Sequence, residues 1–164
     1  MARARPESTS DIQVIGLISD THGLIRPEAL EALKGVELII HAGDIGKPEV
    51  IAALKAIAPV MAIKGNNDNG NWARPLPDTK LVKSGDTQLY VIHNVKELDC
   101  DPVARGYQAV VSGHSHKPSV TIRDGVLFVN PGSAGPRRFK LPIAVGKLFI
   151  RNRQLTAEII ELPV

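Results

Sequence analysis

Short apolar runs alternate with amphipathic segments along the first part of the chain. The runs 12–18, 36–40 and 60–63 have the length of buried strands. Between them, segments 27–33 and 48–57 carry apolar residues at helical spacing, and each begins with a proline, which is favoured in the first turn of a helix. This β-α-β-α-β order predicts three parallel strands joined by right-handed crossovers.

The rest of the chain changes to hairpins and alternating strands. We expect a hairpin over 80–84 and 87–92, a short helix over 101–105, a strand over 108–112, a second hairpin over 120–123 and 126–129, and two alternating strands over 143–150 and 154–160. The first residues show no periodicity and predict a flexible tail over 1–10. These patterns predict one α/β domain over 11–164, parallel in its first half and mostly antiparallel in its second.

Composition narrows the class of protein. A chain of 164 residues buries enough apolar surface to fold without disulfides, and Cys100 is its only cysteine. No apolar run has the length of a membrane span, and the amino terminus carries no signal-like segment, so we expect no membrane partner and a cytoplasmic location. The net charge is only +3, and no arginine-rich run is interleaved with aromatic residues. A nucleic-acid partner is therefore unsupported.

Five of the predicted strands are each followed, within a few residues, by side chains that can bind a metal. These side chains are Asp20 and His22, Asp44, Asn66, His93, and the pair His114 and His116. The rings of the last pair point to the same side of an extended chain, because one residue separates them. Ligands of α/β proteins bind beyond the carboxyl ends of the strands, so we expect all seven side chains to converge on one site.

The chemistry of these donors indicates two metal ions. Seven nitrogen and oxygen donors are too many for one zinc ion, which usually takes four. They suit two ions about 3.5–4 Å apart, which act together in displacement reactions at phosphorus. Carboxylates combined with an amide and imidazoles favour Mn²⁺, our first choice, or Ni²⁺, Co²⁺, Fe or Zn²⁺ over Ca²⁺ and Mg²⁺.

The motifs occur in the order Asp-x-His, Gly-Asp, Gly-Asn-x-Asp, an isolated His, and Gly-His-x-His. This order resembles the signature of the calcineurin-like metallophosphoesterase superfamily, and the resemblance spans about residues 12–133. The short chain and the run Asn130-Pro131-Gly132-Ser133 resemble its small bacterial and archaeal phosphodiesterase branch, which is also similar to the retromer scaffold subunit of eukaryotes. The resemblance implies a four-layer α/β/β/α sandwich of two mixed β-sheets flanked by helices.

The resemblance also implies a role for each donor. The first metal would be bound by Asp20, His22 and His116, the second by Asn66, His93 and His114, and Asp44 would bridge both. A hydroxide between the two ions would then attack the phosphorus of a phosphodiester. Two donors have ordinary alternatives: Asn66 lies in a turn-like run with several asparagines, and a lone histidine such as His93 is often structural.

The block Asn66-Asn67-Asp68 is the expected catalytic segment, and it departs from the family pattern at Asn67. Many superfamily members have a histidine there, often assigned as the general acid. An amide can donate a hydrogen bond to a phosphoryl oxygen but cannot supply a proton. We therefore expect a preference for activated leaving groups, such as those of aryl or nucleotide-like diesters. Asp68 is expected to orient this loop.

Three further side chains are weighed against ordinary roles. His41 matches no ligand position and is expected to be structural or to support the ligands. Arg137 and Arg138 follow Ser133 closely and are candidates for binding a substrate phosphate, although such a basic run is more commonly a solvated loop.

The sequence leaves alternatives open for the function as a whole. The expected activity is that of a phosphodiesterase acting on a small phosphodiester or nucleotide-like substrate. A phosphomonoesterase or nucleotide pyrophosphatase of the same fold, and a non-catalytic protein-binding scaffold, are the alternatives. The scaffold is disfavoured because it has no physical need for all seven donors. Relatives that form oligomers leave a homo-oligomer open.

Overall fold

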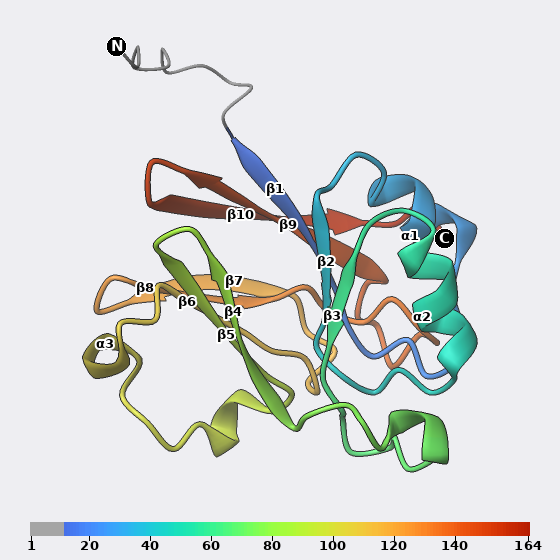
Figure 1. Cartoon of the computed structure of the whole chain (residues 1–164). Coiled ribbons are helices and arrows are strands. Elements are labelled where there is room, and N and C mark those ends of the chain that lie inside the picture. The colour runs from blue at the N-terminus through green and yellow to red at the C-terminus, as the bar shows by residue number, and fades with distance from the viewer. Residues whose placement is uncertain (1–11) are drawn as a thin grey trace, which may run out of the picture.

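Two five-stranded β-sheets are stacked face to face in the computed structural model, which describes residues 12–164 (Figure 1). The tail predicted over 1–10 lies outside the described residues. Within them, no helix is both long and apolar enough to cross a membrane.

The first sheet has the strand order β10-β9-β1-β2-β3. Its parallel strands are β1 (Gln13–Ile18), β2 (Leu38–His41) and β3 (Val60–Ala62). The antiparallel strands β9 (Ala144–Arg151) and β10 (Gln154–Glu161) extend the sheet beyond β1, with Ile15 opposite Leu148. The last hairpin of the chain therefore completes the sheet that the first strand begins, a pairing that the local pattern did not predict.

The second sheet has the order β4-β5-β6-β8-β7. Its strands are β4 (Thr79–Ser84), β5 (Thr87–Ile92), β6 (Ala109–Val111), β7 (Ser119–Arg123) and β8 (Val126–Asn130). The hairpins β4–β5 and β7–β8 are antiparallel, as expected, but β5, β6 and β8 run parallel to one another. The second sheet is therefore mixed, as the resemblance implied, and the second half of the chain pairs mostly antiparallel, as its pattern predicted.

Helices cover the outer faces of both sheets unequally. Helices α1 (Pro27–Ala32) and α2 (Pro48–Lys55) pack on the first sheet, each beginning at its proline. Two short elements lie beside the second sheet: η3 (Val95–Glu97), whose Val95 packs on the outer apolar cluster, and α3 (Pro102–Arg105), which lines a pocket with Val126 and Phe128. A third short helix, η2 (Asn71–Ala73), lies between β3 and β4. The predicted four-layer sandwich is confirmed, with a thin fourth layer.

The main hydrophobic core lies between the two sheets and holds their inner faces against each other. Leu17 and Ile40 of the first sheet pack with Leu89 and Val111 of the second, and all four are buried. A second apolar cluster, including Leu33 and Leu54, lies under α1 and α2. The packing of the two sheets on this shared face brings the loops at the carboxyl ends of their parallel strands together at one edge of the sandwich.

Candidate metal centre

The predicted donors lie on loops that leave the carboxyl ends of five strands. The loops after β1, β2 and β3 come from the first sheet, and those after β5 and β6 come from the second. These are the parallel strands of each sheet, so their carboxyl ends point to a common edge. The site therefore lies across the seam between the two sheets.

Two groups of three donors share Asp20. The first consists of Asp20, His22 and His116, and the second of Asp20, Asp44 and His93, with the donor atoms of each group within 4.8 Å of one another. The shortest contacts join His93 Nε2 to Asp44 Oδ2 at 3.3 Å and His116 Nε2 to Asp20 Oδ1 at 3.5 Å. Five of the seven predicted donors thus form one compact cluster.

Asp44 lies between the two halves of this cluster. Its Oδ2 is 3.7 Å from His22 Nε2 and 3.3 Å from His93 Nε2, and these two histidines belong to different groups. Asp20 Oδ1 likewise lies 3.5–3.9 Å from the Nε2 atoms of His22, His93 and His116. Both aspartates therefore face histidines of both groups, and the position of Asp44 is compatible with the bridging role that the resemblance implies.

The remaining two predicted donors lie at the exposed rim of the cluster. The ring centroid of His114 is 5.2 Å from that of His93. Asn66 lines a pocket together with His93 and, like His114, is exposed. Both side chains lie on the His93 side, where the second metal is expected.

The unpaired polar atoms of the cluster fit a bound cation. Asp20 Oδ1, His22 Nε2 and His93 Nε2 are buried and have no hydrogen-bond partner among the described residues. Buried polar atoms in native proteins are normally paired, so such a set indicates a missing ligand. Oxygen and imidazole donors together are suited to a transition-metal ion. The residues present therefore fit divalent metals.

Burial and charge act in opposite directions on the two aspartates. Burial raises the pKa of Asp20, an effect partly offset by the hydroxyl of Ser19 and the neighbouring rings of His93 and His116. Burial would also raise the pKa of Asp44, but the adjacent His93 ring and a hydrogen bond from the Asn67 backbone outweigh it and hold that pKa below its usual range. A cation beside Asp20 would stabilise its ionised form.

The backbone at the donors has an uncommon conformation. Asp20, His22, Asp44, His114 and His116 all have positive φ, between 48° and 72°. Non-glycine residues adopt this left-handed region rarely, and such strain persists at functional sites because the surrounding structure enforces it. Five of the nine non-glycine residues with positive φ in the described chain are predicted metal ligands.

Two glycines let the donor loops approach closely. A Cβ on Gly65 would overlap the backbone nitrogen and carboxylate of Asp44, and a Cβ on Gly113 would overlap the side chain of Ser19. Both glycines precede a predicted donor in the chain. Their missing side chains allow the loops of β3 and β6 to pack against those of β1 and β2.

Neighbouring polar groups hold the two aspartates in place. Asp20 Oδ2 accepts hydrogen bonds from the Ser19 hydroxyl at 2.7 Å and from the backbone nitrogen of His114 at 3.0 Å. Asp44 Oδ1 accepts one from the Asn67 backbone at 2.9 Å, and the Asn67 side-chain nitrogen lies 3.4 Å from Asp44 Oδ2. Asn67 thus positions Asp44, a role that the sequence did not indicate.

Asp68 is buried and joins two loops. Its carboxylate accepts hydrogen bonds from three backbone nitrogens, those of Ile45, Gly46 and Gly65, at 2.9–3.1 Å. These bonds connect the loop after β2 to the loop after β3. The arrangement agrees with the expected orienting role and places Asp68 behind the donors.

His41 is buried beneath the site. Its Nδ1 accepts a hydrogen bond from the Gly43 backbone at 3.1 Å, and its Nε2 is 3.0 Å from the Thr21 hydroxyl, which itself donates to the Ile45 carbonyl. These partners fit a neutral ring that is protonated at Nε2. Burial lowers the pKa of His41 to about 3. His41 therefore joins the loops after β1 and β2 without facing the site as a ligand.

A pH dependence of stability follows from this burial. The folded protein keeps His41 neutral, whereas the unfolded chain binds a proton as pH falls below 6.5. The contribution of His41 to stability is therefore present above that pH and decreases by about 1.4 kcal/mol per pH unit toward lower pH. In metal-free protein, His41→Asn should flatten the dependence of unfolding free energy on pH between about 6 and 4, measured by urea unfolding. Equal slopes in the two proteins would contradict this role.

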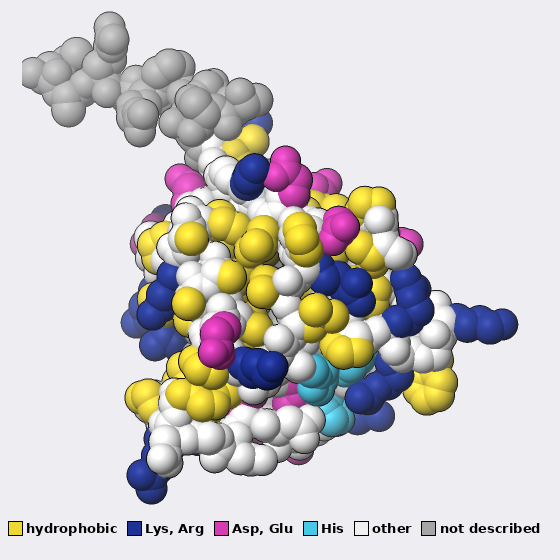
Figure 2. All heavy atoms as spheres, turned by 90° about the vertical axis from the view of Figure 1, so that its right-hand side faces the viewer, with side chains coloured by type: hydrophobic (Ala, Val, Ile, Leu, Met, Phe, Trp, Pro, Cys, Tyr) yellow, Lys and Arg dark blue, Asp and Glu magenta, His cyan; other side chains and the backbone are white. Residues whose placement is uncertain are grey.

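The two arginines after Ser133 have different surroundings. The Arg137 guanidinium donates to the backbone carbonyls of Leu141 and Val164, at 3.2 and 3.0 Å. Arg138 lies close enough to His116 to contribute, after burial, to lowering the pKa of that histidine. Arg138 is therefore the better placed of the two for a phosphate at the site. Figure 2 shows histidine side chains at the surface of this face with Lys and Arg side chains close beside them.

Two residues that hold the donor loops in place were not identified as parts of the site from the sequence. The side-chain nitrogen of Asn130 donates to the Gly113 carbonyl at 2.9 Å and thereby holds the loop of His114. The Ser133 hydroxyl donates to the backbone carbonyl of Asp20 at 3.1 Å. Both belong to the Asn-Pro-Gly-Ser run, whose presence was noted as a resemblance but whose contacts no local pattern reveals.

Comparison with known families agrees with this geometry. Residues 14–153 match the model of the calcineurin-like phosphoesterase superfamily domain. The chain belongs to this superfamily. The resemblance inferred from the order of the motifs is thereby confirmed, and this calcineurin-like phosphoesterase belongs to a family of metal-dependent phosphoester hydrolases.

Individual relatives of this calcineurin-like phosphoesterase include enzymes and a sorting protein. A probable metallophosphoesterase from Methanothermobacter thermautotrophicus is 33% identical over 111 residues, which make up 63% of each chain, so the match spans less than two thirds of that relative. The structure of an archaeal phosphodiesterase aligns at 24% identity with a TM-score of 0.70, covering 90% of this chain and 100% of the other. Vps29 of Entamoeba histolytica, complexed with zinc, aligns at 19% identity with a TM-score of 0.69, covering 91% and 99%. The two structural matches concern the fold alone.

Proposed function

We propose that this chain is a phosphodiesterase that uses two divalent metal ions. The observation that carries the proposal is the position of Asp44 between His22 and His93, beside buried donor atoms without hydrogen-bond partners. The archaeal phosphodiesterase of the same fold supports the choice of a diester. A small phosphodiester or nucleotide-like molecule is the proposed substrate, and the lone Cys100 fits a reducing, cytoplasmic location.

The proposed ligand sets follow the two halves of the donor cluster. Asp20, His22 and His116 would hold one ion; Asn66, His93 and His114 the other; and Asp44 would bridge them. When bound, such ions lower the pKa of water and neutralise charge on phosphoryl oxygens. Mn²⁺ is our first choice, and the zinc bound by a Vps29 of the same fold keeps Zn²⁺ as an alternative.

The residues of the chain orient the substrate around these sites. Arg138, near His116, supplies a cation for a non-bridging phosphoryl oxygen. Asn67 and Asp68 hold Asp44 and the loop after β3 against the loop after β2. No histidine occupies the position of Asn67, so a leaving group of low pKa is favoured.

The experiment that tests the proposal measures hydrolysis of bis-p-nitrophenyl phosphate. Protein stripped with a chelator should be inactive, and activity should return with Mn²⁺, Ni²⁺, Co²⁺ or Zn²⁺. The thermal midpoint should rise in parallel, because an ion that binds only the folded state stabilises it. The monoester p-nitrophenyl phosphate serves as the comparison and should react more slowly; the opposite ranking would favour a phosphomonoesterase.

A protein-binding scaffold is the second candidate, favoured by the likeness to Vps29. A scaffold predicts that metal raises the thermal midpoint while no phosphoester is hydrolysed with any of the four ions. That result would overturn the proposed enzyme and direct attention to a protein partner.

A further inference from the structure

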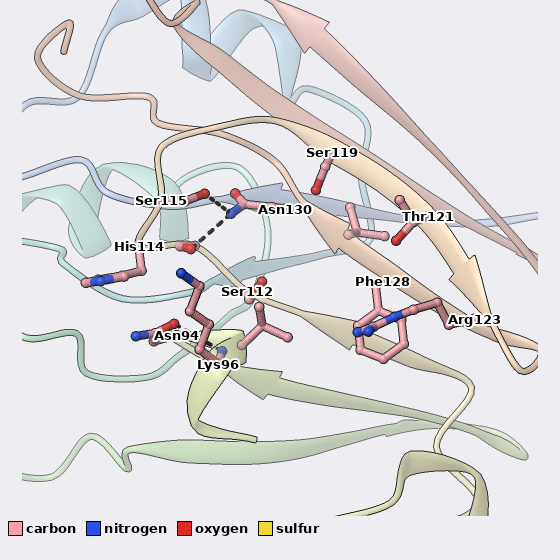
Figure 3. A pocket seen from close by; sticks show the side chains of 13 residues that line it. Asn94, Lys96, Ser112, His114, Ser115, Ser119, Thr121, Arg123, Phe128 and Asn130 are labelled. Atoms are coloured by element: carbon pink, nitrogen blue, oxygen red, sulfur yellow. Dashed lines mark hydrogen bonds between the residues drawn. The ribbon is translucent and has the colours of Figure 1, made fainter. Parts of the chain in front are cut away.

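A pocket on the outer face of the second sheet begins at the metal centre. It has a volume of about 380 Å³ and runs from His114 across β8 and β7. Figure 3 shows His114 and Lys96 at one end and Arg123, stacked on Phe128, at the other. Its size lies within the usual range for small-molecule sites, roughly 300–1,000 Å³. A substrate bound at the metal centre can therefore extend into this pocket.

The lining of the pocket has the chemistry of an anion site. None of its lining residues is acidic, and two of them, Lys96 and Arg123, are cationic. Four hydroxyl groups, those of Ser112, Ser115, Ser119 and Thr121, lie between or beside them. Cations and hydroxyl donors together bind phosphate oxygens well.

Neither cation is held in an ion pair by the described residues, although Arg123 also borders a neighbouring pocket whose lining includes Asp101 and Asp124. Within residues 12–164, no carboxylate forms an ion pair with Lys96 or Arg123, and no hydrogen bond engages the Lys96 ammonium. Cζ of the Arg123 guanidinium lies 4.1 Å from the centroid of the Phe128 ring, a cation–π contact on the wall of the pocket. Stacking fixes the plane of a guanidinium while leaving its edge available for a bidentate contact with phosphate.

A neighbouring pocket at the metal centre has the reverse charge. A second pocket, of about 400 Å³, touches Asn66 and His93. It is lined by three carboxylates, those of Asp78, Glu97 and Asp99, against the single cation Lys64, which is 3.8 Å from Asp78. An additional anionic group on a substrate is thus repelled on this side and attracted on the side of Lys96.

We propose that the pocket from His114 to Arg123 binds a second phosphate of the substrate. This inference rests on the proposed phosphodiesterase activity and specifies the substrate class as small diesters that carry a further phosphate group. Lys96 contacts the part of the substrate next to the metal centre, and Arg123 binds the distal phosphate. The neighbouring acidic pocket fixes the direction in which the substrate lies.

The test compares two diesters that release the same leaving group from the same kind of phosphorus. They are thymidine 5′-(p-nitrophenyl phosphate) and its counterpart with a phosphate on the 3′ oxygen. Metal-loaded protein should favour the phosphorylated diester about tenfold in kcat/KM, mainly through KM, as expected of a charge-assisted contact. The preference should shrink as ionic strength rises.

The ratio of the two kcat/KM values is the readout for the variants, because it cancels any general loss of metal or fold. Arg123→Ala should reduce the ratio to within about twofold of unity, and Arg123→Lys should keep part of it because the charge remains. Lys96→Ala removes a contact that both diesters share, so it should lower both kcat/KM values and leave their ratio within about twofold of that of the unmodified protein. Lys83→Ala, which removes an exposed lysine on β4 of the same sheet, should leave the ratio unchanged.

The outcomes separate this inference from the proposed function. Hydrolysis of both diesters with equal kcat/KM overturns the second-phosphate site and leaves the phosphodiesterase standing. A preference that survives Arg123→Ala overturns the assignment to this pocket. Failure to hydrolyse either diester with any metal overturns the proposed function, and the substrate site falls with it.

Discussion

Asp44→Asn is expected to lower kcat for bis-p-nitrophenyl phosphate by about 10³-fold or more. Asp44, like Asp20, faces histidines of both donor groups, through contacts of 3.7 and 3.3 Å. Its replacement by an amide removes the charge proposed to be shared by two ions while keeping the shape of the side chain. Metal ions contribute several kcal/mol to charge stabilisation at phosphorus, and each 1.36 kcal/mol corresponds to a factor of ten in rate.

Asp124→Asn is the matched control for this variant. Asp124 lies exposed in the turn between β7 and β8 and has nearly the same left-handed backbone as Asp44, with φ of 53° against 57°. The same substitution there should leave kcat within about twofold. Metal content measured on both proteins distinguishes a lost ion from a misplaced one. If Asp44→Asn retains more than a tenth of the activity, the bridging role of Asp44 is wrong.

Asn67→His is expected to raise the hydrolysis of an alkyl phosphodiester by about 10²-fold. Positioned general acids contribute about 10²–10⁴-fold, and the protein has an amide at position 67, where the resemblance to the superfamily leads us to expect a histidine. The backbone hydrogen bond from residue 67 to Asp44, 2.9 Å long, survives the substitution, so the aspartate stays in place. An aryl diester, whose leaving group needs no proton, should change by less than about threefold.

Asn69→His places the same ring on the next exposed asparagine of this loop and serves as the control. It should change neither the alkyl nor the aryl rate. Methyl p-nitrophenyl phosphate and dimethyl phosphate, assayed with the same metal, supply the two classes of leaving group. An unchanged alkyl rate in Asn67→His would show that the missing general acid does not limit this enzyme.

Local sequence pattern was sufficient for the strands that carry the donors. Each of these strands is a short apolar run that ends at a polar side chain, so its type and its end can be read without knowing its neighbours. Boundaries shifted by one or two residues, as in β2, which begins at Leu38 and includes His41. The helix predicted over 48–57 ends at Lys55. These differences leave every predicted donor on the loop expected for it.

Pairings between distant strands could not be predicted in the same way. The alternation of β9 and β10 indicates one buried face but does not say which sheet they join. The parallel pairing of β5, β6 and β8 depends on connections that run across the sheet. The pocket between Lys96 and Arg123 was missed for the same reason, since its two cations come from separate elements that only the folded sheet brings together.

The left-handed backbone of the donors sets a limit on how stable this protein can become while keeping its site. Each such residue costs on the order of 1 kcal/mol relative to glycine, and Asp20, His22, Asp44, His114 and His116 all share the conformation. Their sum is comparable to the whole free energy of unfolding of a small domain, about 5–15 kcal/mol. Selection for thermal stability alone would replace these residues with glycine one by one. The resulting protein would keep the fold and have a larger free energy of unfolding, but it would lack the metal ligands. The two packed sheets thus keep the ligand loops in a strained backbone conformation that the loops would not adopt on their own.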